Sequence, residues 1–216
     1  MSPSAARTHV LAAPDAAPLG RPFKVLHLVR HGEGTHNVTH KYHSEAEFDA
    51  QLTDRGHAQA KRAGQMLRDV PIELVVASPL SRALQTAMGA TSEHPDAPKL
   101  VVHEACREVM SIGMEPCNRR RLVSELTTRY PIPAYHYPAQ PADSDSGWRG
   151  DETDPVVLER GRAFLEFLLA RPETHIAVFT HQVFLFVIMN QGVSANGVQA
   201  TYFDNGEVRT VVLHRA

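Results

Sequence analysis

The chain has few of the features that mark extracellular, membrane or nucleic-acid-binding proteins. Only two of its 216 residues are cysteine, Cys106 and Cys117, which argues against a disulfide scaffold and predicts free thiols in a reduced, intracellular compartment. No apolar run approaches the roughly 20 residues that cross a bilayer, so membrane insertion is excluded. A formal net charge of -2 provides no overall basic field for nucleic acid. We therefore expect a cytoplasmic protein in which any anion site is built from locally gathered cations.

The first 22 residues differ in composition from the rest. They are rich in Ala and Pro and show no periodicity, which predicts a flexible leader over 1–22. Arg7 and Arg21 among alanines resemble an organelle transit peptide, but Asp15 and the prolines argue against one. The remaining residues, 23–216, suit one domain with a full core, because 43% hydrophobic and 21% charged residues are ordinary for a globular protein.

Beyond the leader, short apolar runs alternate with segments of helical periodicity. Apolar runs of strand length predict buried strands at 23–29, 72–77, 99–105 and 175–180. Helical spacing predicts helices between Thr53 and Pro71 and at 80–91 and 155–172, with Thr53 as the N-cap of the first. The stripe of the last helix is expected to contain Val157, Gly161, Phe164, Leu165 and Leu168.

This alternation predicts an α/β fold, a three-layer sandwich in which helices cover both faces of a mostly parallel sheet. Two apolar segments flank the turn-forming residues Asp204 to Gly206, which predicts a C-terminal hairpin at one side of the sheet. Residues 104–153 break the alternation, with one helical candidate at 118–130 and a polar loop after 139. We interpret 104–153 as an irregular cap inserted over a site.

Charged residues follow the predicted strands at the point where each strand ends. In parallel sheets, ligands bind beyond the carboxyl ends of the strands. Four separate segments should therefore bring their polar residues to one rim, and Asn37 follows in the loop after the first. The candidate site residues gathered there are Arg30, His31, Asn37, Arg82, Glu108 and His181.

This residue set suits a phosphoryl group. Phosphate carries nearly two negative charges and three acceptor oxygens, and the planar guanidinium of arginine can bind two of those oxygens at once. A neutral His31, held in one tautomer, could attack phosphorus and form a phosphohistidine. Arg30, Arg82 and a protonated His181 could stabilise the oxygens, and no metal is required. The leaving oxygen needs a proton from a buried carboxylic acid, for which Glu104, Glu108 and Glu115 compete.

Several motifs occur in an order that resembles the histidine phosphatase superfamily, also called phosphoglycerate mutase-like. They are RHGE after an apolar strand, Asn37, LTDRG, SPLSRALQTA, REVM and VFTHQVFL, and the resemblance runs from about Lys24 to Leu213. CREVMSIGMEPCNRRR and FDNGEVRTVVL are most similar to the small eukaryotic phosphatases of this group. The resemblance implies His31 as nucleophile and Glu108 as proton donor. It also implies that a phosphate pocket is formed by Arg30, Asn37, Arg82 and His181.

One departure from the family pattern bears on activity. The second histidine is usually followed by Gly-Gly or Ser-Gly in this family, whereas Gln182 and Val183 follow His181 here. A β-branched residue in place of glycine could tighten the pocket or shift the following helix. We nevertheless expect catalysis, because the charged pocket residues are all present.

Other polar residues have structural interpretations beside functional ones. We expect Glu33 to order its loop, and the run Arg119 to Arg121 to be a solvated face rather than a grip for a second acidic group of the substrate. Trp148 could serve as substrate platform or lid anchor, and the sequence does not decide between them. His36, His40 and His43 lie close in sequence but complete no recognisable zinc set.

The sequence favours a metal-independent phosphomonoesterase without a cofactor, acting on a small phosphorylated substrate. A cofactor-dependent phosphoglycerate mutase would use the same pocket but usually has a longer chain and a GW segment after the first motif, which is absent here. A non-catalytic module that binds a phosphorylated ligand is the third possibility, and only the Gln182-Val183 departure supports it. Natural substrate and oligomeric state do not follow from the sequence.

Overall fold

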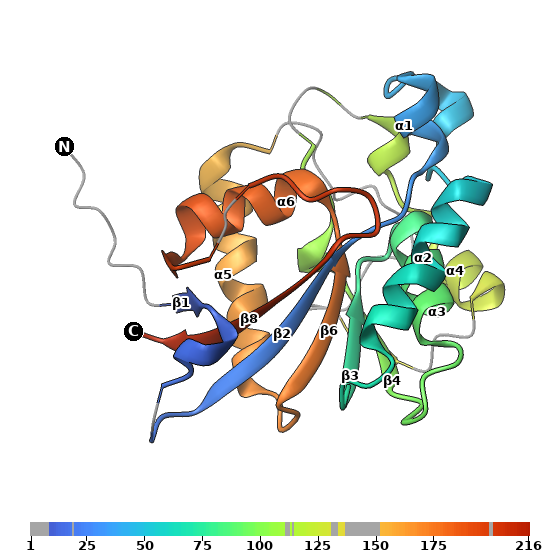
Figure 1. Cartoon of the computed structure of the whole chain (residues 1–216). Coiled ribbons are helices and arrows are strands. Elements are labelled where there is room, and N and C mark those ends of the chain that lie inside the picture. The colour runs from blue at the N-terminus through green and yellow to red at the C-terminus, as the bar shows by residue number, and fades with distance from the viewer. Residues whose placement is uncertain are drawn as a thin grey trace.

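The structure is a computed structural model that describes residues 9–18, 20–110, 113, 115–130, 134–136, 152–198 and 201–216. Within these ranges eight strands form one sheet in the order β5-β4-β3-β6-β2-β8-β1-β7 (Figure 1). Neighbouring strands are parallel except where β8 pairs with β2 and with β1. The strands are β1 His9–Ala12, β2 Phe23–Arg30, β3 Leu74–Ala77, β4 Lys99–His103, β5 Ala134–His136, β6 His175–Thr180, β7 Ser194–Asn196 and β8 Val208–Arg215.

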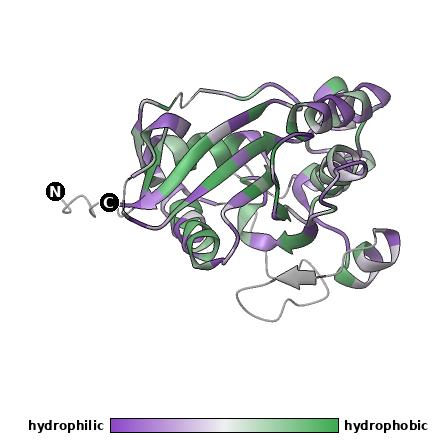
Figure 2. Ribbon diagram, turned by 60° about the horizontal axis from the view of Figure 1, so that its bottom comes forward, coloured by the Kyte–Doolittle hydropathy of each residue, from purple (hydrophilic) through white to green (hydrophobic). Residues whose placement is uncertain are grey.

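Helices cover both faces of this sheet, which confirms the predicted three-layer α/β architecture. On one face lie α5 (Asp154–Ala170) and α6 (Gln182–Val187), and on the other lie α2 (Asp54–Leu67), α3 (Ser81–Thr91) and α4 (Val123–Arg129) (Figure 1). The short α1 (Thr35–Thr39) follows the carboxyl end of β2. Figure 2 shows the apolar residues concentrated in the strands and on the helix sides turned toward them.

Strands β2, β3 and β6 each supply side chains to two cores because successive residues point to opposite faces. On β2, Leu26 and Leu28 join the core under α5, whereas Val29 joins the core under α2 and α3. The five apolar residues predicted on the stripe of α5 are all buried. Thr53 caps α2 as predicted, since its hydroxyl accepts a hydrogen bond from Gly56 N at 3.0 Å.

The predicted leader is wrong in one part, because residues 9–12 form strand β1. This segment, HVLA, is buried over its whole length, and β1 lies between β7 and β8 in the sheet. Sheet pairing satisfies its backbone N–H and C=O groups, which allows four residues to be buried without a periodic pattern.

The predicted C-terminal hairpin is also wrong. Its turn is present, with Gly206 at a positive φ of 75°, and β8 follows it. The described residues between β7 and that turn, however, form no strand. The carbonyls of Thr201 and Tyr202 accept hydrogen bonds from Arg209, and Phe203 N donates to the side chain of Gln182. Since these side chains satisfy the backbone, β8 pairs instead with β2 and β1.

The predicted insertion contains the expected helix, now α4, and also the edge strand β5, which the sequence did not indicate. Its polar loop up to residue 151, including Trp148, lies outside the described residues. Within the described ranges, no helix has the length and apolar character needed to span a bilayer.

Candidate active site

Three neighbouring parallel strands bring the first site residues together. β2 ends at Arg30, which lies in register with Thr180 at the end of β6. His31 follows β2, His181 follows β6, and α3 begins just beyond β3 and carries Arg82 near its start. The carboxyl ends of these strands meet at one edge of the sheet, as predicted.

His31 is buried, with 2% of its surface exposed. Its Nδ1 lies 2.7 Å from the carbonyl oxygen of Gly32, which can only accept, so Nδ1 carries the proton and Nε2 keeps its lone pair. Burial, followed by the charge of Arg82, lowers the pKa of His31 well below its usual value. The ring is therefore neutral near neutral pH, in the tautomer that a nucleophile attacking through Nε2 requires.

Arg82 is fully buried and connects His31 to the cap. Its Nε donates to His31 Nε2 at 3.2 Å, Nη1 to the Cys117 carbonyl at 2.6 Å, and Nη2 to Asn118 Oδ1 at 2.6 Å. These three bonds orient the guanidinium so that it faces the nucleophile.

His181 packs against His31, with ring centroids 5.1 Å apart. Its Nε2 lies 2.7 Å from Ser78 Oγ, and its buried Nδ1 has no hydrogen-bond partner among the described residues. Burial, and then Arg82, lowers the pKa of His181 well below its usual value. Burial beside arginines thus favours a neutral His181 in the free protein, and the protonated His181 expected beside a bound phosphoryl group stays a prediction.

A single pocket of about 290 Å³ is lined by five of the six predicted residues, namely Arg30, His31, Asn37, Arg82 and Glu108. Arg30 is anchored by Nη1, which donates to the Phe203 carbonyl at 2.7 Å, while its buried Nε has no partner in the described part of the chain. Burial lowers the pKa of Arg30, and the nearby Glu108 opposes that shift. Two arginines and an unprotonated imidazole nitrogen thus share a pocket that suits a tetrahedral oxyanion.

The structure places the three glutamates considered as proton donor in different surroundings. Glu104 accepts hydrogen bonds from Arg120 at 2.6 Å and Arg107 at 3.2 Å and does not line the pocket. Glu108 is buried in the pocket wall, where it accepts from the backbone N–H groups of Val109, Val183 and Phe184 at 2.9, 3.3 and 3.0 Å. Glu115 also lines the pocket, and burial raises its pKa.

Comparisons with known proteins agree with this geometry. The model of the histidine phosphatase superfamily (branch 1) matches residues 26–216. The chain belongs to that superfamily. Phosphoglycerate mutase-like protein 1 of Arabidopsis thaliana is 32% identical over 204 residues, 77% of this chain and 71% of the plant protein. A probable phosphatase of Schizosaccharomyces pombe is 29% identical over 167 residues, 74% of each chain.

Solved structures of both phosphatases and mutases share the fold. A putative alpha-ribazole-5'-P phosphatase from Escherichia coli has a TM-score of 0.59 and 23% identity, covering 87% of this chain and 89% of that one. Phosphoglycerate mutase from Bacillus anthracis also has a TM-score of 0.59, at 17% identity, and covers 89% and 88%. The chain is thus a histidine phosphatase superfamily member with phosphatase- or mutase-type activity, and the fold does not distinguish the two.

The departure from the family pattern leaves helix α6 in place. Val183 has 39% of its surface exposed, and its side chain lines the pocket while its N–H bonds Glu108. Gln182 Oε1 accepts a hydrogen bond from Phe203 N at 3.1 Å. The two residues therefore form part of the pocket wall, and the start of α6 donates backbone N–H groups to Glu108.

Asn37 orders the loop after the first motif. Its Oδ1 accepts a hydrogen bond from Gly34 N at 2.9 Å, and its Nδ2 lies 3.2 Å from His36 Nε2. His36 itself is a pocket residue that the sequence did not indicate. Burial, followed by the charges of Arg82 and Arg30, lowers the pKa of His36 to about 2, so its ring is neutral as well. In the sequence, only the position of His36 directly before Asn37 indicated that it could lie in the pocket.

The turn before β8 was predicted as a hairpin turn but acts at the site. Asn205 Nδ2 donates to the His31 carbonyl at 3.1 Å, and Gly206 N lies 3.1 Å and 3.2 Å from the carbonyls of Arg30 and His31. This turn therefore fixes the backbone that carries the nucleophile. Its conformation was predictable from its residues, but the distant backbone that it contacts was not.

Asp49 was also missed, although it holds the start of α3. Its carboxylate accepts from Ser81 N at 2.8 Å and Ser81 Oγ at 2.5 Å and pairs with Arg121 Nε at 3.1 Å. Because Ser81 immediately precedes Arg82, Asp49 fixes the backbone position from which the Arg82 side chain extends. No local pattern distinguishes it from a surface aspartate.

The run Arg119 to Arg121 forms ion pairs, which corrects the expectation of a solvated face. Arg119 pairs with Glu45 at 3.2 Å, the buried Arg120 with Glu104 at 2.6 Å, and Arg121 with Asp49. Glu33 orders its loop as expected, since Thr53 Oγ1 donates to its Oε1 at 2.8 Å.

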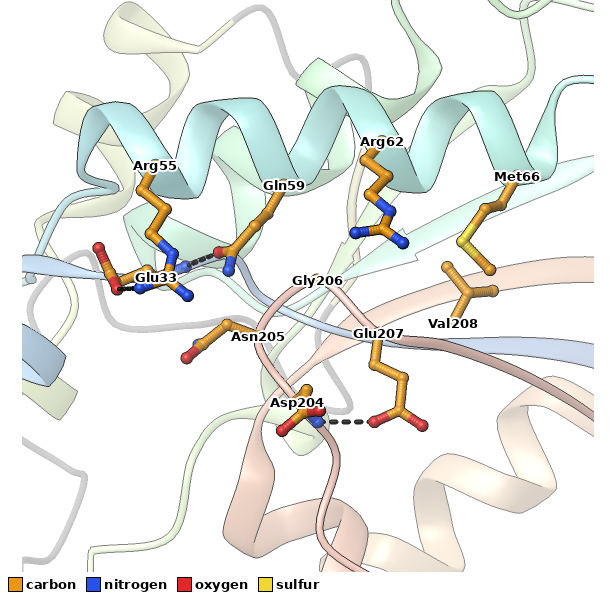
Figure 3. Close-up of a pocket in the computed structure, with 10 residues that line it drawn as sticks. All are labelled: Glu33, Arg55, Gln59, Arg62, Met66, Asp204, Asn205, Gly206, Glu207 and Val208. Carbon is orange, nitrogen blue, oxygen red and sulfur yellow. Dashed lines mark hydrogen bonds and ion pairs between the residues drawn. The ribbon is translucent and has the colours of Figure 1, made fainter.

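A separate groove lies between α2 and the turn at 204–208. Figure 3 shows Arg55, Gln59 and Arg62 facing that turn, and Arg55 pairs with Glu33 at 3.3 Å. None of the six predicted site residues lines it. Cys106 and Cys117 are buried free thiols, as expected. No group of three or more His, Cys, Asp or Glu suited to a metal ion occurs among the residues that the structure describes.

Proposed function

We propose that the protein is a metal-independent phosphomonoesterase that hydrolyses a small phosphorylated metabolite through a phosphohistidine at His31. One observation carries the proposal: His31 keeps its proton on Nδ1, and its Nε2 accepts a hydrogen bond from Arg82 Nε in a pocket that His31 lines together with Arg30 and Arg82. Hydrolysis also needs a carboxyl group beside the leaving oxygen, and Glu108 lies in the same pocket wall.

In the first step, the Nε2 lone pair of His31 forms a bond to phosphorus while the bond from phosphorus to the ester oxygen breaks. The leaving oxygen takes its proton from the carboxylic acid form of Glu108, which becomes a carboxylate. In the free protein Arg82 Nε–H points at Nε2. A bound phosphoryl oxygen offers that N–H a stronger, charged acceptor, which frees the lone pair for attack.

In the second step, Glu108 takes a proton from a water molecule whose oxygen attacks phosphorus. The bond between His31 Nε2 and phosphorus breaks, inorganic phosphate forms, and both residues return to their starting states. Arg30 and Arg82 contact the equatorial oxygens in both steps, and these fixed charges require no reorganisation as negative charge builds up.

A phosphoglycerate mutase would share the first step and differ only in the acceptor, which would be a second hydroxyl instead of water. The Arabidopsis relatives carry a mutase-like name, so the product has to be measured. Incubating 3-phosphoglycerate with 2,3-bisphosphoglycerate and the protein should yield no isomer, whereas an aryl phosphate should release free phosphate to water. The Gln182-Val183 departure alone supports a non-catalytic binding module, and it leaves His31, Arg82 and Glu108 in the pocket.

Rapid quenching into alkali tests the mechanism, because phosphohistidine survives base. We expect a mass increase of one phosphoryl group on the peptide that contains His31 during turnover of an aryl phosphate, and no loss of rate with a chelator. His31→Ala should abolish turnover. His57→Ala, which removes an exposed histidine of α2, is the matched control. Retained turnover in His31→Ala would refute the proposal.

A further inference from the structure

The pocket wall beyond the phosphate-binding arginines carries one acidic side chain that the proposed reaction does not use. Glu115 lines the pocket together with Tyr42, Val109 and Val183. These neighbours are neutral, and Glu115 itself is only partly buried. The leaving alcohol of a bound phosphomonoester would lie along this wall if its phosphoryl group occupied the site beside His31.

Hydrogen bonds hold the Glu115 carboxylate in this position. Its Oε2 accepts from Asn118 Nδ2 at 2.6 Å, and Asn118 Oδ1 accepts from Arg82 Nη2 at 2.6 Å. The carboxylate is therefore connected through a single amide to the guanidinium that faces the nucleophile. It cannot swing away from the pocket without breaking a bond to the amide that also positions Arg82.

Basic residues near this wall are engaged elsewhere. Arg119, Arg120 and Arg121 pair with Glu45, Glu104 and Asp49, and none of the three lines the pocket. Arg30 and Arg82 are the only arginines or lysines of the described ranges that line it, and the proposed reaction assigns both to the phosphoryl group. A second anionic group on the substrate would thus meet a carboxylate, with no further arginine or lysine of the described ranges in the pocket lining to pair with it.

We propose that Glu115 is a specificity residue that selects phosphomonoesters with a neutral or cationic leaving alcohol and disfavours phosphorylated carboxylic acids and bisphosphates. The inference rests on the proposed function, since it assumes that the phosphoryl group lies at His31. A carboxylate about 6 Å from Glu115, at the intermediate dielectric of a half-exposed pocket, should cost about tenfold in kcat/KM.

Two nearly isosteric substrates measure this effect, 4-carbamoylphenyl phosphate and 4-carboxyphenyl phosphate. The ratio of their kcat/KM values is compared between the wild type and Glu115→Gln, which keeps an acceptor for Asn118. This double ratio cancels the different reactivities of the two leaving groups. We expect the preference for the carboxamide to fall by about tenfold in Glu115→Gln. Glu93→Gln, an exposed acid beyond the far end of α3, should leave it unchanged.

Calorimetry gives the same double ratio from binding affinities. The affinities of the two substrates are compared between His31→Ala and the double variant His31→Ala/Glu115→Gln, so this measurement does not depend on turnover. A double ratio within about twofold of unity in affinity and in any turnover would overturn the role of Glu115. If the affinities show the tenfold effect but no substrate is hydrolysed, the specificity inference stands and the proposed phosphomonoesterase activity fails. Thermal unfolding of each variant verifies that it is folded.

Discussion

His27 should make the stability of the protein depend on pH. This dependence tests whether burial keeps the His27 ring neutral in β2, the strand that carries Arg30. His27 lies in the middle of β2 and is buried with 3% of its surface exposed. Its Nδ1 lies 2.9 Å from Thr210 Oγ1, and its ring stacks on that of His175. Burial, followed by His175, lowers the pKa of His27 from 6.5 to about 4.

The lowered pKa of His27 makes the free energy of unfolding depend on pH. Between about pH 6.5 and pH 4 the unfolded chain binds a proton at His27 that the folded protein does not, so stability falls as the pH falls. With these two pKa values, the folded state loses about 2 kcal/mol between about pH 7.5 and pH 5 from His27 alone. Other groups add their own pH dependence, so only a comparison with a variant isolates this contribution.

Replacing His27 with glutamine removes the titrating group and keeps a partner for Thr210. Urea unfolding near pH 7.5 and near pH 5 gives the free-energy gap, which is the difference in the free energy of unfolding between the wild type and His27→Gln. On going to the lower pH, this gap should shift by about 2 kcal/mol in favour of the variant. His57→Gln, at an exposed position of α2, should keep a constant gap. If the His27→Gln gap is also constant, the ring is not held neutral by burial, and the reasoning is wrong.

Three further substitutions test the site. Arg82→Lys should lower kcat/KM about 100-fold and the free energy of unfolding by about 2 kcal/mol, because one ammonium cannot replace three directed N–H bonds. Arg62→Lys, at an exposed position, is the control in both assays. Glu108→Gln should lower kcat/KM for an alkyl phosphate about 100-fold but kcat/KM for p-nitrophenyl phosphate far less, since kcat/KM reports the step in which the alcohol leaves and nitrophenolate leaves without a proton; equal losses in kcat/KM would contradict its role as acid. Gly56→Ala should destabilise the fold by about 2 kcal/mol in urea unfolding, because its methyl would lie 2.1 Å from the Glu33 carbonyl oxygen, and an unchanged midpoint would contradict this close approach.

Strand ends were the part of the site that the sequence could predict. Arg30, His31 and His181 each follow an apolar run, and a parallel sheet brings such positions to one edge whatever the rest of the chain does. Arg82 followed from the same rule through the turn before α3. These residues share one local signal, a buried strand that ends in a charged or polar side chain.

Non-local pairing explains what the sequence could not predict. The turn at Asp204 to Gly206 has a strong local signal, but the partner of β8 depends on strands far away in the chain, so the hairpin was wrong. The same holds for the competing carboxylates. Glu104 is withdrawn from the pocket by Arg107 and Arg120, and no spacing in the sequence indicates those pairs.

Ionisation of the histidines is also a tertiary property. His31, His36 and His181 are neutral because burial and nearby arginines lower the pKa of all three rings together. The protonated His181 expected beside a phosphoryl group would have to overcome burial and the repulsion by Arg82. An arriving dianion reverses that balance, because its negative charge opposes both burial and the arginines. Oxyanion binding should therefore be coupled to proton uptake.

Sulfate tests this coupling, since it stays a monomeric dianion near neutral pH and any proton taken up belongs to the protein. Calorimetric titrations near pH 6.5 in two buffers of different ionisation enthalpy give the number of protons bound with the ligand, which we expect to be positive and at most about one. His181→Gln keeps a partner for Ser78 and should reduce the uptake, because His181 has a buried Nδ1 without a described partner that could hold the proton. Identical apparent enthalpies in the two wild-type titrations would mean that the ligand changes no protonation state. In that case the oxyanion would be bound by the arginines alone, beside imidazoles that stay neutral.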